Sequence, residues 1–521
     1  MRVVRLINCR NRAPARGGFE TAGFAGYAAS LAPRLVGWDR LIEICNEHTG
    51  GLLAGQPVEL EHGLKKELRL RDLVPMQILL MVGVSWAGIA AKQGSTHPMI
   101  WIAGIVFFFL PQAAVVTYCV RLWPIEGGVY QWAKFALGPL AGFLSAWNYA
   151  LYAVLTVSQL GILTVTSLSY ALGPGAAWMV DSQPLTFAFD GVLLVGVLAI
   201  NVLGFHFGRW VSHFGAGLMM ALALTLFVLI FWHPASAMRP HVNPQMPFAF
   251  GRPLWSLLTL NLYVKVAFNA YSGLEQIAVF AGETRSAGRA IVLSAWIASP
   301  AIVLIYVLMT GSMLTYVRAD QIDLAGAIPQ TLAAAFGGGA GVWMGRAMIL
   351  ALSAFTICSY SLVTAETSRL PMVAGWDALL PGWFTKLNAR FGTPVRSLVV
   401  IVAIAATFAV LASLGTGRQE AFQLLITSGQ LSFGLYYCAM FAVPLFTGDR
   451  FGARPGFWLK ACAVSGLAIT VVQCVLATVP IVEVNNTWGY AAKVGGTGLI
   501  INLVGAAIYW SGRRRAAGRQ I

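Results

Sequence analysis

A run of polar residues interrupts an otherwise apolar stretch of this chain. The stretch extends from about residue 254 to residue 280, and the segment F-N-A-Y-S-G-L-E occupies positions 268–275 near its middle. If the stretch crosses a membrane, no water can hydrogen-bond to it there, and irregular backbone is tolerated only where it lines a cavity within the protein. N–H and C=O groups freed at a broken helix can bind a small polar solute near the middle of the bilayer. The segment therefore predicts one wall of a solute-binding site.

No other group of residues predicts reactive chemistry. The seven histidines are dispersed, the seven cysteines form no C-x-x-C pair, and no G-x-x-x-x-G-K-[ST] loop occurs. These patterns give no support to a metal site, a redox centre or a nucleotide-driven pump. We therefore expect no catalytic residues, no metal and no cofactor. The alternative of a membrane enzyme would need polar residues gathered at one membrane face, whereas here they gather at mid-depth.

Composition and hydropathy indicate a membrane protein. Of the 521 residues, 58% are hydrophobic and 11% are charged, whereas soluble proteins average about 25% charged residues. Apolar stretches of about 20 residues can cross a bilayer as helices. Twelve spans are predicted, at about 74–96, 98–120, 138–172, 185–204, 208–232, 254–281, 290–316, 342–368, 394–414, 420–446, 457–480 and 493–511. The expected fold class is an all-α, polytopic membrane protein.

Lysine and arginine residues between the spans predict the orientation. The larger group lies on the side that carries the residues before Pro75: Lys65, Lys66, Arg69, Arg71, Arg121, Lys134, Arg209, Arg285, Arg289, Arg369, Lys386, Arg390, Arg396, Arg450, Arg454, Lys460, Arg513, Arg514, Arg515 and Arg519. The smaller group lies on the opposite side: Arg239, Arg252, Arg318, Arg346, Arg418 and Lys493. Cytoplasmic loops carry the excess of such residues, so we expect a multi-pass protein of the cell membrane with both termini in the cytoplasm. Because the basic residues lie at span ends rather than on one face, the net charge of +15 does not indicate a nucleic-acid partner.

The chain divides into three regions. Residues 1–64 carry several Arg and Gly residues but no apolar run long enough for a secretory signal. They predict a disordered cytoplasmic tail, or an upstream extension from a misassigned start codon. Residues 65–511 are expected to form the membrane domain, and residues 512–521 a basic cytoplasmic tail.

The broken span predicts an internal repeat. Discontinuous helices occur in membrane proteins built from two repeats of inverted topology. Repeats of five spans at about 74–232 and 254–446, with two accessory spans at about 457–511, require a partner break in the first span. The sequence there is G-V-S-W-A-G-I-A-A at 83–91, with Gly83 and Gly88 about midway along the span.

Four segments in a fixed order carry a family resemblance. They are W-P-I-E-G-G-V-Y-Q-W-A-K-F-A-L-G-P-L-A-G-F-L-S-A-W-N-Y at 123–149, F-N-A-Y-S-G-L-E-Q-I-A-V-F-A-G-E-T at 268–284, E-T-S-R-L-P-M-V-A-G-W-D-A-L-L-P-G-W-F at 366–384 and G-T-P-V-R at 392–396. Together they resemble the amino acid–polyamine–organocation (APC) superfamily of transporters, amino acid permease type, over roughly residues 65–511. The resemblance implies a LeuT-type fold, with a 5+5 inverted repeat and discontinuous helices 1 and 6, and import or exchange of amino acids or related amines.

Two positions depart from that family pattern. Trp86 stands where the family's first span has a small Gly-rich run around the substrate carboxylate, and its bulk should reshape the pocket. Some family members have a buried Lys in the fifth span for proton coupling. The fifth span here has only Arg209 and His213, near its cytoplasmic start.

An amino acid zwitterion leaving water needs a partner for each charge. Free N–H groups at a helix start can take the carboxylate, and free carbonyls at a helix end can take the ammonium group. We expect the carboxylate at the backbone of Ala87, Gly88 and Ile89, and the ammonium group at carbonyls near Ser85 and around Phe268–Tyr271. Selectivity would then come from side chains along the two breaks; the remaining candidates are Trp86, Asn269, Tyr271, Ser272 and Gly273, with Asn148 or Tyr149 of the third span. The alternative for each aromatic residue is plain helix packing.

Four charged residues are coupling or gating candidates. Lys265 lies within the sixth span, where it could serve as a cation for proton coupling in place of sodium, contact an anionic part of the substrate, or extend to the outer interface. Glu275 is expected to cap the second half of the broken helix. Glu283 and Arg369 could pair in an inner gate, or could be separate solvated charges at span ends.

These expectations describe a carrier, and they leave its cargo open. The sequence favours a permease for an amino acid or related small amine that works by alternating access, with proton coupling or exchange and no indication of sodium. An organic cation or polyamine carrier of the same family is the alternative, against which Lys265 argues mildly. The lipid bilayer and a small-molecule substrate are the expected partners, and oligomeric state is not specified by the sequence.

Overall fold

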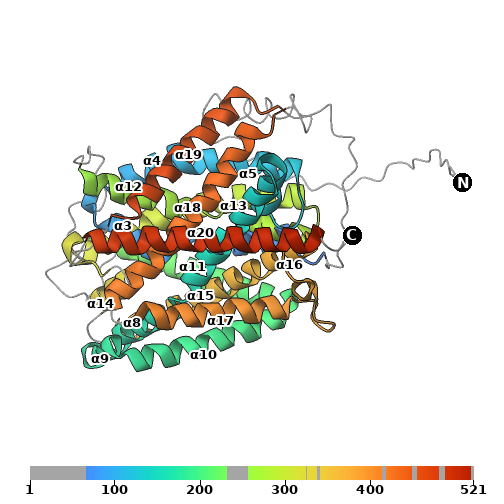
Figure 1. Cartoon of the computed structure of the whole chain (residues 1–521). Coiled ribbons are helices and arrows are strands. Elements are labelled where there is room, and N and C mark those ends of the chain that lie inside the picture. The colour runs from blue at the N-terminus through green and yellow to red at the C-terminus, as the bar shows by residue number, and fades with distance from the viewer. Residues whose placement is uncertain are drawn as a thin grey trace, which may run out of the picture. The chain divides into compact units, whose positions relative to one another are not determined.

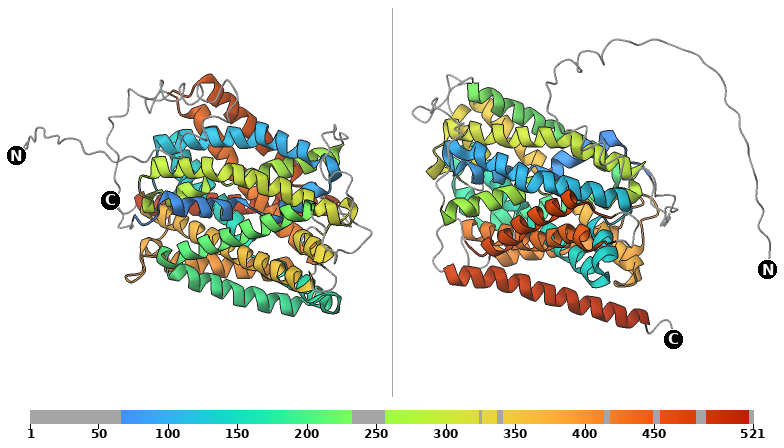
Figure 2. Two further views of the ribbon diagram at one scale, coloured as in Figure 1. Left: turned by 180° about the vertical axis from the view of Figure 1, so that it is seen from behind. Right: turned by 90° about the horizontal axis from the view of Figure 1, so that it is seen from above.

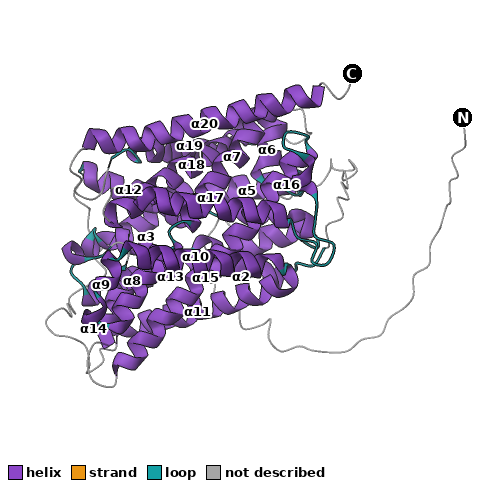
Figure 3. Cartoon of the chain, turned by 60° about the horizontal axis from the view of Figure 1, so that its bottom comes forward, coloured by secondary structure: helices purple, strands orange, loops and turns teal. Residues whose placement is uncertain are grey.

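The computed structural model describes residues 66–231, 256–323, 326–336, 341–413, 418–448, 454–479 and 487–517. Within these ranges the regular secondary structure is helical, apart from one isolated bridge between Leu68 and Thr284 (Figure 3). The predicted extension at 1–64 lies outside the described residues. The expected all-α fold is confirmed.

The first half of the membrane domain contains the helices of the first five spans. They are α2 (Leu70–Met81), α3 (Val84–Ala91), α4 (His97–Gly104), the π-helical turn η2 (Ile105–Phe109), α5 (Leu110–Leu122), α6 (Val129–Leu137), α7 (Pro139–Val157), α8 (Leu160–Leu172), α10 (Gln183–Val202) and α11 (Phe205–Phe231). The third span, predicted to be unusually long, is α7 followed by α8, with a step at residues 158–159 between them.

The second half contains the helices of the other spans. They are α12 (Leu257–Tyr271), the 3-10 helix η4 (Gln276–Glu283), α13 (Ala287–Tyr316), α14 (Ala327–Phe336), α15 (Gly341–Thr367), α16 (Arg369–Trp376), α17 (Val395–Ser413), α18 (Arg418–Phe446), α19 (Phe457–Leu476) and α20 (Thr487–Ala517). Because α20 continues to Ala517, most of the region predicted as a tail after residue 511 extends this helix.

The number of membrane spans agrees with the sequence once broken spans are included. Nine helices within the described residues are long and apolar enough to cross a membrane, and the bent pair α2–α3 makes a tenth. The two further predicted spans are α17, which has a shorter apolar part, and the broken pair α12–η4. The first and sixth spans are therefore the broken ones, as expected for two five-span repeats.

The surface of the helix bundle is apolar where a bilayer would contact it. Only 22% of the most apolar part of α10 and 17% of that of α20 are buried in the molecule, against 78% for α7–α8. Large exposed apolar side chains lie on the outer helices: Val192, Val195, Val471, Val475, Leu499 and Leu503. Figure 1 shows α20 in front of the bundle, and the right-hand view of Figure 2 shows it along one edge, where it contacts α7 and α18. Apolar faces of this size indicate contact with lipid, and the protein is a multi-pass membrane protein.

The two broken spans bend at glycine positions. Helices α2 and α3 meet at 49° across extended residues Val82 and Gly83. Helix α12 ends at Tyr271, and Gly273 follows with φ of 122°, a backbone conformation that favours glycine. We name these places break 1 (residues 82–83) and break 2 (residues 272–274).

Candidate functional site

A tyrosine hydroxyl spans break 1. The Gly83 N–H donates to the Tyr306 hydroxyl at 2.8 Å, and that hydroxyl donates to the Met81 carbonyl at 2.7 Å. Tyr306 is fully buried on α13, so a residue of the second half of the chain satisfies the backbone freed in the first half. Unpaired buried backbone groups are costly, and Tyr306 adds a partner to two groups that also bond to each other at 3.0 Å.

A second tyrosine has the same role at break 2. The Gly273 N–H donates to the Tyr437 hydroxyl of α18 at 2.7 Å. The Gly273 carbonyl accepts from the Gln77 side-chain amide of α2 at 2.8 Å. Gln77 therefore joins the first broken span to the backbone of the sixth.

The two breaks lie against each other. A Cβ atom placed on Gly273 would lie 3.0 Å from the Met81 side chain, so only a glycine leaves room there. Tyr271 and Tyr306 make an edge contact with ring centroids 6.2 Å apart, and both pack on Trp101 of α4. Helix ends from both repeats thus meet in one buried region, as predicted.

Glu275 brings a carboxyl group to break 2. It is 0% exposed and accepts hydrogen bonds on one oxygen from Tyr437 and from the Gln112 amide of α5, the latter at 3.0 Å. Its side chain makes no capping hydrogen bond to the start of η4, and its expected capping role stays a prediction. The carboxyl group instead joins three elements, η4, α5 and α18.

The buried oxygens around break 2 outnumber the available donors. Glu275 Oε1, Gln77 Oε1 and Gln112 Oε1 are buried and have no hydrogen-bond partner within the described part of the chain. The amide nitrogens of both glutamines already donate to acceptors, which fixes the direction in which each amide points. Buried polar groups are normally hydrogen-bonded. The site is therefore suited to a ligand that supplies N–H donors.

The first-span candidates lie at and beyond the start of α3. The Trp86 indole lies over Gly83 at break 1, since a Cβ on that glycine would be 2.6 Å from the ring. Ser85 lies in the first turn of α3, whereas Ala87, Gly88 and Ile89 are buried farther along the helix. Gly88 is used for packing, because a Cβ there would lie 2.7 Å from Ala327 of α14.

The start of α3 leaves one backbone donor, that of Ser85, without a partner within the described residues. The first N–H groups of a helix have no intrahelical acceptor. Those of Gly83 and Trp86 donate to Tyr306 and to the Gly83 carbonyl, respectively. The Ser85 N–H is then available to a ligand, a few residues before the expected contacts.

The sixth-span candidates mostly complete their own helix. Asn269 donates to the Lys265 carbonyl at 2.8 Å, and the Ser272 hydroxyl donates to the Phe268 carbonyl at 2.6 Å. The Phe268 ring packs against Phe108 and Tyr437. These side chains shape break 2, and its unpaired polar atoms belong to the Glu275 carboxyl group and the two glutamine amides.

Lys265 points away from break 2. It is 2% exposed, and its ammonium group donates to the Val479 carbonyl, just after the end of α19, at 3.0 Å. Asn261, one turn earlier on α12, donates to the same carbonyl. The lysine is thus buried rather than extended into an interface, and it forms no ion pair with a described residue.

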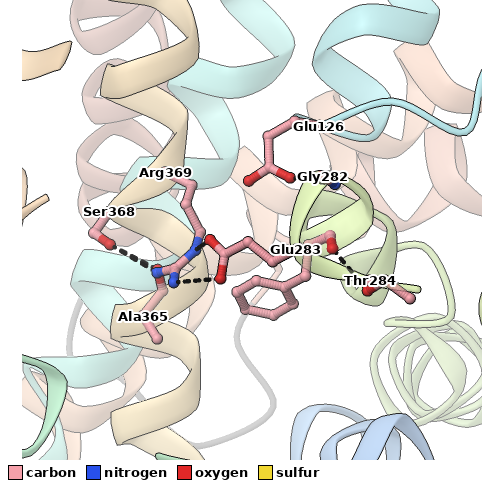
Figure 4. Close-up of polar contacts among 8 residues, drawn as sticks. Glu126, Gly282, Glu283, Thr284, Ala365, Ser368 and Arg369 are labelled. Carbon is pink, nitrogen blue, oxygen red and sulfur yellow. Dashed lines mark hydrogen bonds and ion pairs between the residues drawn. The ribbon is translucent and has the colours of Figure 1, made fainter. Parts of the chain in front are cut away.

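Glu283 and Arg369 are paired, as one of the two sequence alternatives predicted. Two parallel bonds join them, Arg369 Nε to Glu283 Oε1 at 2.9 Å and Nη2 to Oε2 at 3.2 Å (Figure 4). Both side chains are buried, so they are not separate solvated charges. The Glu283 carbonyl also accepts from the N–H groups of Glu67 and Leu68. The pair therefore fastens the end of η4 to α16 at one end of the bundle, which we call the Arg369 end.

Glu126 completes this cluster and was not singled out in the sequence. Its Oε2 accepts from the Gly282 N–H at 2.7 Å, and its buried Oε1 has no partner within the described residues. Burial and the Glu283 carboxylate raise the pKa of Glu126 well above its usual range, against the opposing effect of Arg369. Figure 4 shows both carboxyl groups close to the Gly282–Glu283 turn.

The two third-span candidates face different partners. Asn148 and Asn502 of α20 exchange amide hydrogen bonds, so Asn148 joins an accessory helix rather than the breaks. The Tyr149 hydroxyl donates to Glu366 Oε2 of α15 at 2.6 Å. Glu366 is fully buried, although the sequence placed it near a span end.

The most important residues that sequence reasoning missed are Tyr306, Tyr437, Gln77 and Gln112. Each is a buried polar residue within an apolar helix. The two glutamines carried a usable signal, since an uncharged amide within a span needs a partner there. The tyrosines carried none, because a tyrosine in a membrane helix is common in packing.

The sequence was then compared with known proteins. Residues 73–500 match the family model described as amino acid permease. An uncharacterized transporter of Legionella pneumophila is 24% identical over 388 residues, covering 73% of this chain and 81% of that protein. A polyamine transporter of Oryza sativa is 24% identical over 351 residues, covering 64% and 60%. A putative arginine/ornithine antiporter of Escherichia coli is 25% identical over 361 residues, covering 64% and 73%.

Proposed function

The chain belongs to the amino acid permease family and is a transporter rather than an enzyme, and we propose that it moves an amino acid or a related small amine across the cell membrane by alternating access. Proton coupling or exchange drives the transport in this proposal. The excess of buried acceptors at break 2 carries the proposal.

The two breaks supply complementary partners for a zwitterion. The Ser85 N–H, at the positive end of α3, suits a carboxylate. Glu275 Oε1 and the free amide oxygens of Gln77 and Gln112 suit an ammonium group. Met81 and Gly273 bring the two breaks into contact, so one small molecule can reach both.

Selectivity would come from the aromatic side chains around the breaks. Trp86 covers Gly83, and Tyr271 packs on Trp101 and Tyr306. In the proposal these rings limit the volume left for the substrate side chain. Trp86 is half-buried, so it can turn away from Gly83 as a ligand enters.

A polyamine or organic cation is the second candidate cargo. The acceptors at break 2 would bind an amine without a carboxylate equally well, and one relative is named as a polyamine transporter. Lys265 argued against a cationic cargo from the sequence. Its ammonium group points away from break 2 and donates to the Val479 carbonyl, so it no longer argues against a cation bound at break 2.

Matched pairs that differ by one carboxylate separate the two cargoes. L-Ornithine and putrescine form one pair, and L-arginine and agmatine form another. Thermal unfolding of the detergent-purified protein is measured with each, because a ligand stabilises the folded state by mass action. Larger shifts with the two amino acids support the amino acid proposal, and larger shifts with the decarboxylated amines support the second cargo.

A wider panel and a transport assay complete the test. The panel contains the other amino acids and small carboxylates, and every compound that shifts unfolding is then followed as a radiolabel into proteoliposomes. If no compound stabilises the protein or enters the vesicles, the proposed function is wrong. Uptake driven by a preloaded compound identifies exchange, and uptake driven by an imposed pH gradient identifies proton coupling.

We also propose that the Arg369 end faces the cytoplasm, with both termini there. The positions of Lys and Arg in the connections support this orientation. A Ser511→Cys variant, at an exposed position near the end of α20, tests it in whole cells. A membrane-impermeant maleimide should label this variant, above the level of the unsubstituted protein, only after the cells are permeabilised. Labelling of intact cells would reverse the orientation.

A further inference from the structure

Glu366 is a second buried carboxyl group, for which the proposed function has no use. It lies next to the last residue of α15 and is 0% exposed. The Tyr149 hydroxyl donates to its Oε2 at 2.6 Å, and its Oε1 is buried without a hydrogen-bond partner within the described residues. One donor for two carboxyl oxygens is an unusually poor environment for a negative charge.

The ionisable groups around Glu366 do not supply that charge with a counterion. Tyr149 and Tyr152 face it from α7, and Tyr436 faces it from α18 with a buried hydroxyl that has no described partner. The other two neighbours are charged groups, Glu275 at the start of η4 and Arg369 on α16. The three tyrosines are neutral, and Glu275 is itself acidic.

Among the described residues Arg369 is the one neighbouring cation, and it is already engaged. It forms both bonds of a bidentate pair with Glu283 and donates to the Ala365 carbonyl. A buried carboxylate with a single donor and no free counterion costs more than a neutral carboxyl group with an unsatisfied hydroxyl. The arrangement therefore favours a protonated Glu366 while Arg369 is paired with Glu283.

A small cavity lies beside the same helix and reaches the residues that precede Glu366. Ser361, Leu362 and Ala365 of α15 line it together with Arg369, opposite Gly208 and Ser212 of α11. Glu366 follows directly after Ala365 in the chain. Glu366 does not line the cavity in this structure, so contact between its carboxyl group and water there requires the Arg369 end to open.

We propose that Glu366 is a proton-carrying residue of the transport cycle, controlled by the Glu283–Arg369 pair. When the Arg369 end opens, Glu283 moves away with η4 and Arg369 loses its counterion. The O–H bond of the Glu366 carboxyl group then breaks, its proton passes to water in the cavity, and the new carboxylate balances the Arg369 charge. Closure restores the Glu283–Arg369 pair and requires Glu366 to take up a proton again. This inference rests on the alternating access proposed above.

Infrared spectroscopy of the ligand-free, detergent-purified protein tests the protonation directly. A protonated carboxyl group has a C=O stretching band that a carboxylate lacks. At neutral pH the Glu366→Gln variant should lose one such band, and Tyr149→Phe should shift the same band because it removes the hydrogen bond to Oε2. Glu283→Gln leaves Glu366 in place but removes the counterion of Arg369, so it should lose the same band because Glu366 then ionises. Unchanged acid bands in both Glu366→Gln and Tyr149→Phe would overturn the proposal, and Tyr149→Phe alone decides if Glu366→Gln does not fold.

Proton movement tests the coupling. Proteoliposomes that contain a pH-sensitive dye are given L-ornithine or L-arginine, and proton flux is recorded with radiolabel uptake. The Glu366→Gln variant should retain exchange of labelled for unlabelled compound and lose the accompanying proton flux. Normal proton flux in that variant would overturn the proposal. If the unsubstituted protein transports neither compound, the choice of cargo is wrong, whereas the infrared result still decides the state of Glu366.

Discussion

The two breaks are built alike and carry different charge. At each, a glycine N–H donates to a tyrosine hydroxyl that comes from the second half of the chain, Tyr306 at break 1 and Tyr437 at break 2. At break 1 the Tyr306 hydroxyl in turn donates a hydrogen bond to the neutral Met81 carbonyl. At break 2 the Tyr437 hydroxyl donates a hydrogen bond to the Glu275 carboxyl group. The same glycine–tyrosine hydrogen bond therefore occurs at a neutral backbone turn in the first span and at an ionisable site in the sixth.

This difference divides the chemistry of the proposed site. Break 1 leads into the start of α3, whose N–H groups favour an anion without any charged side chain. Break 2 follows the end of α12, and there the buried Glu275 adds a group that can take a full charge. Break 1 should therefore respond to packing changes and break 2 to changes of charge and pH.

The tyrosine substitutions should show the largest difference between the breaks. Tyr437→Phe leaves the Gly273 N–H unpaired and removes one of two side-chain donors to Glu275. We expect a loss of about 2–4 kcal/mol in the free energy of unfolding, because an unsatisfied buried group costs about 1–3 kcal/mol and more near a charge. Unfolding in detergent, followed by tryptophan fluorescence, measures this loss.

Tyr306→Phe is the matched variant at break 1. The Gly83 N–H can still donate to the Met81 carbonyl, 3.0 Å away, so both backbone groups retain a partner. We expect a loss of only about 1 kcal/mol, the usual net value of one hydrogen bond. Equal losses for the two variants would show that the carboxyl group does not distinguish the breaks.

Removal of the charge at break 2 is the next largest effect. Glu275→Gln keeps the size of the side chain and removes the carboxylate proposed to bind an ammonium group. A hydrogen bond to a charged group contributes about 1.5–3 kcal/mol, so L-ornithine should bind roughly ten-fold or more weakly. Isothermal titration calorimetry at several pH values measures this change.

The pH dependence of binding makes the same test sharper. In the unsubstituted protein, ornithine binding should strengthen as pH rises and Glu275 ionises, and it should be nearly independent of pH in the Gln variant. Tyr306→Phe should keep the dependence of the unsubstituted protein. A pH dependence that survives Glu275→Gln would assign the titrating group to another residue.

The sequence predicted the place of break 2 better than that of break 1. Asn269, Ser272, Gly273 and Glu275 are polar or small residues close together within one apolar stretch, and the chain does break there. The first span offered two glycines, and only the bend beside Gly83 is used. Gly88 instead lets α3 approach Ala327. Composition alone could not separate a glycine that bends a helix from one that lets two helices pack closely.

The partners of the breaks could not be predicted, because they come from distant parts of the chain. The contact of Gly83 with Tyr306 joins residues 223 positions apart, and that of Gly273 with Tyr437 joins residues 164 positions apart. Patterns of neighbouring residues in the sequence do not indicate pairs so far apart. Glu283 and Arg369 were predicted as possible partners because they have opposite charges and lie at the ends of their spans on the same membrane face. Glu366 and Tyr149 had no such signal, since a buried acid with a tyrosine resembles neither an ion pair nor a packing motif.

The backbone at break 2 should be less tolerant of substitution than that at break 1. Gly273→Ala places a Cβ on a residue with φ of 122° and within 3.0 Å of Met81. Strained backbone of this kind costs about 1–3 kcal/mol, and thermal unfolding should reveal the loss. Gly83→Ala is the matched control, with a normal φ of −96°. Its new Cβ meets the Trp86 ring, which is half-buried and can turn aside, so a smaller loss is expected. A larger loss for Gly83→Ala would mean that Trp86 is fixed against break 1.

The smallest effect is expected for Lys265, on the same helix that leads to break 2. Its ammonium group is bound to the Val479 carbonyl and not to Glu275, so its charge should not control the titration at the break. The Lys265→Met variant should therefore show the same dependence of ornithine uptake on external pH as the unsubstituted protein, and Lys265→Arg, which keeps the charge, serves as the control. A flattened pH profile in Lys265→Met alone would place the coupling proton on the lysine. The pH dependence at break 2 would then come from Lys265 of α12. The two breaks would differ only in the hydrogen bonds that Glu275 accepts.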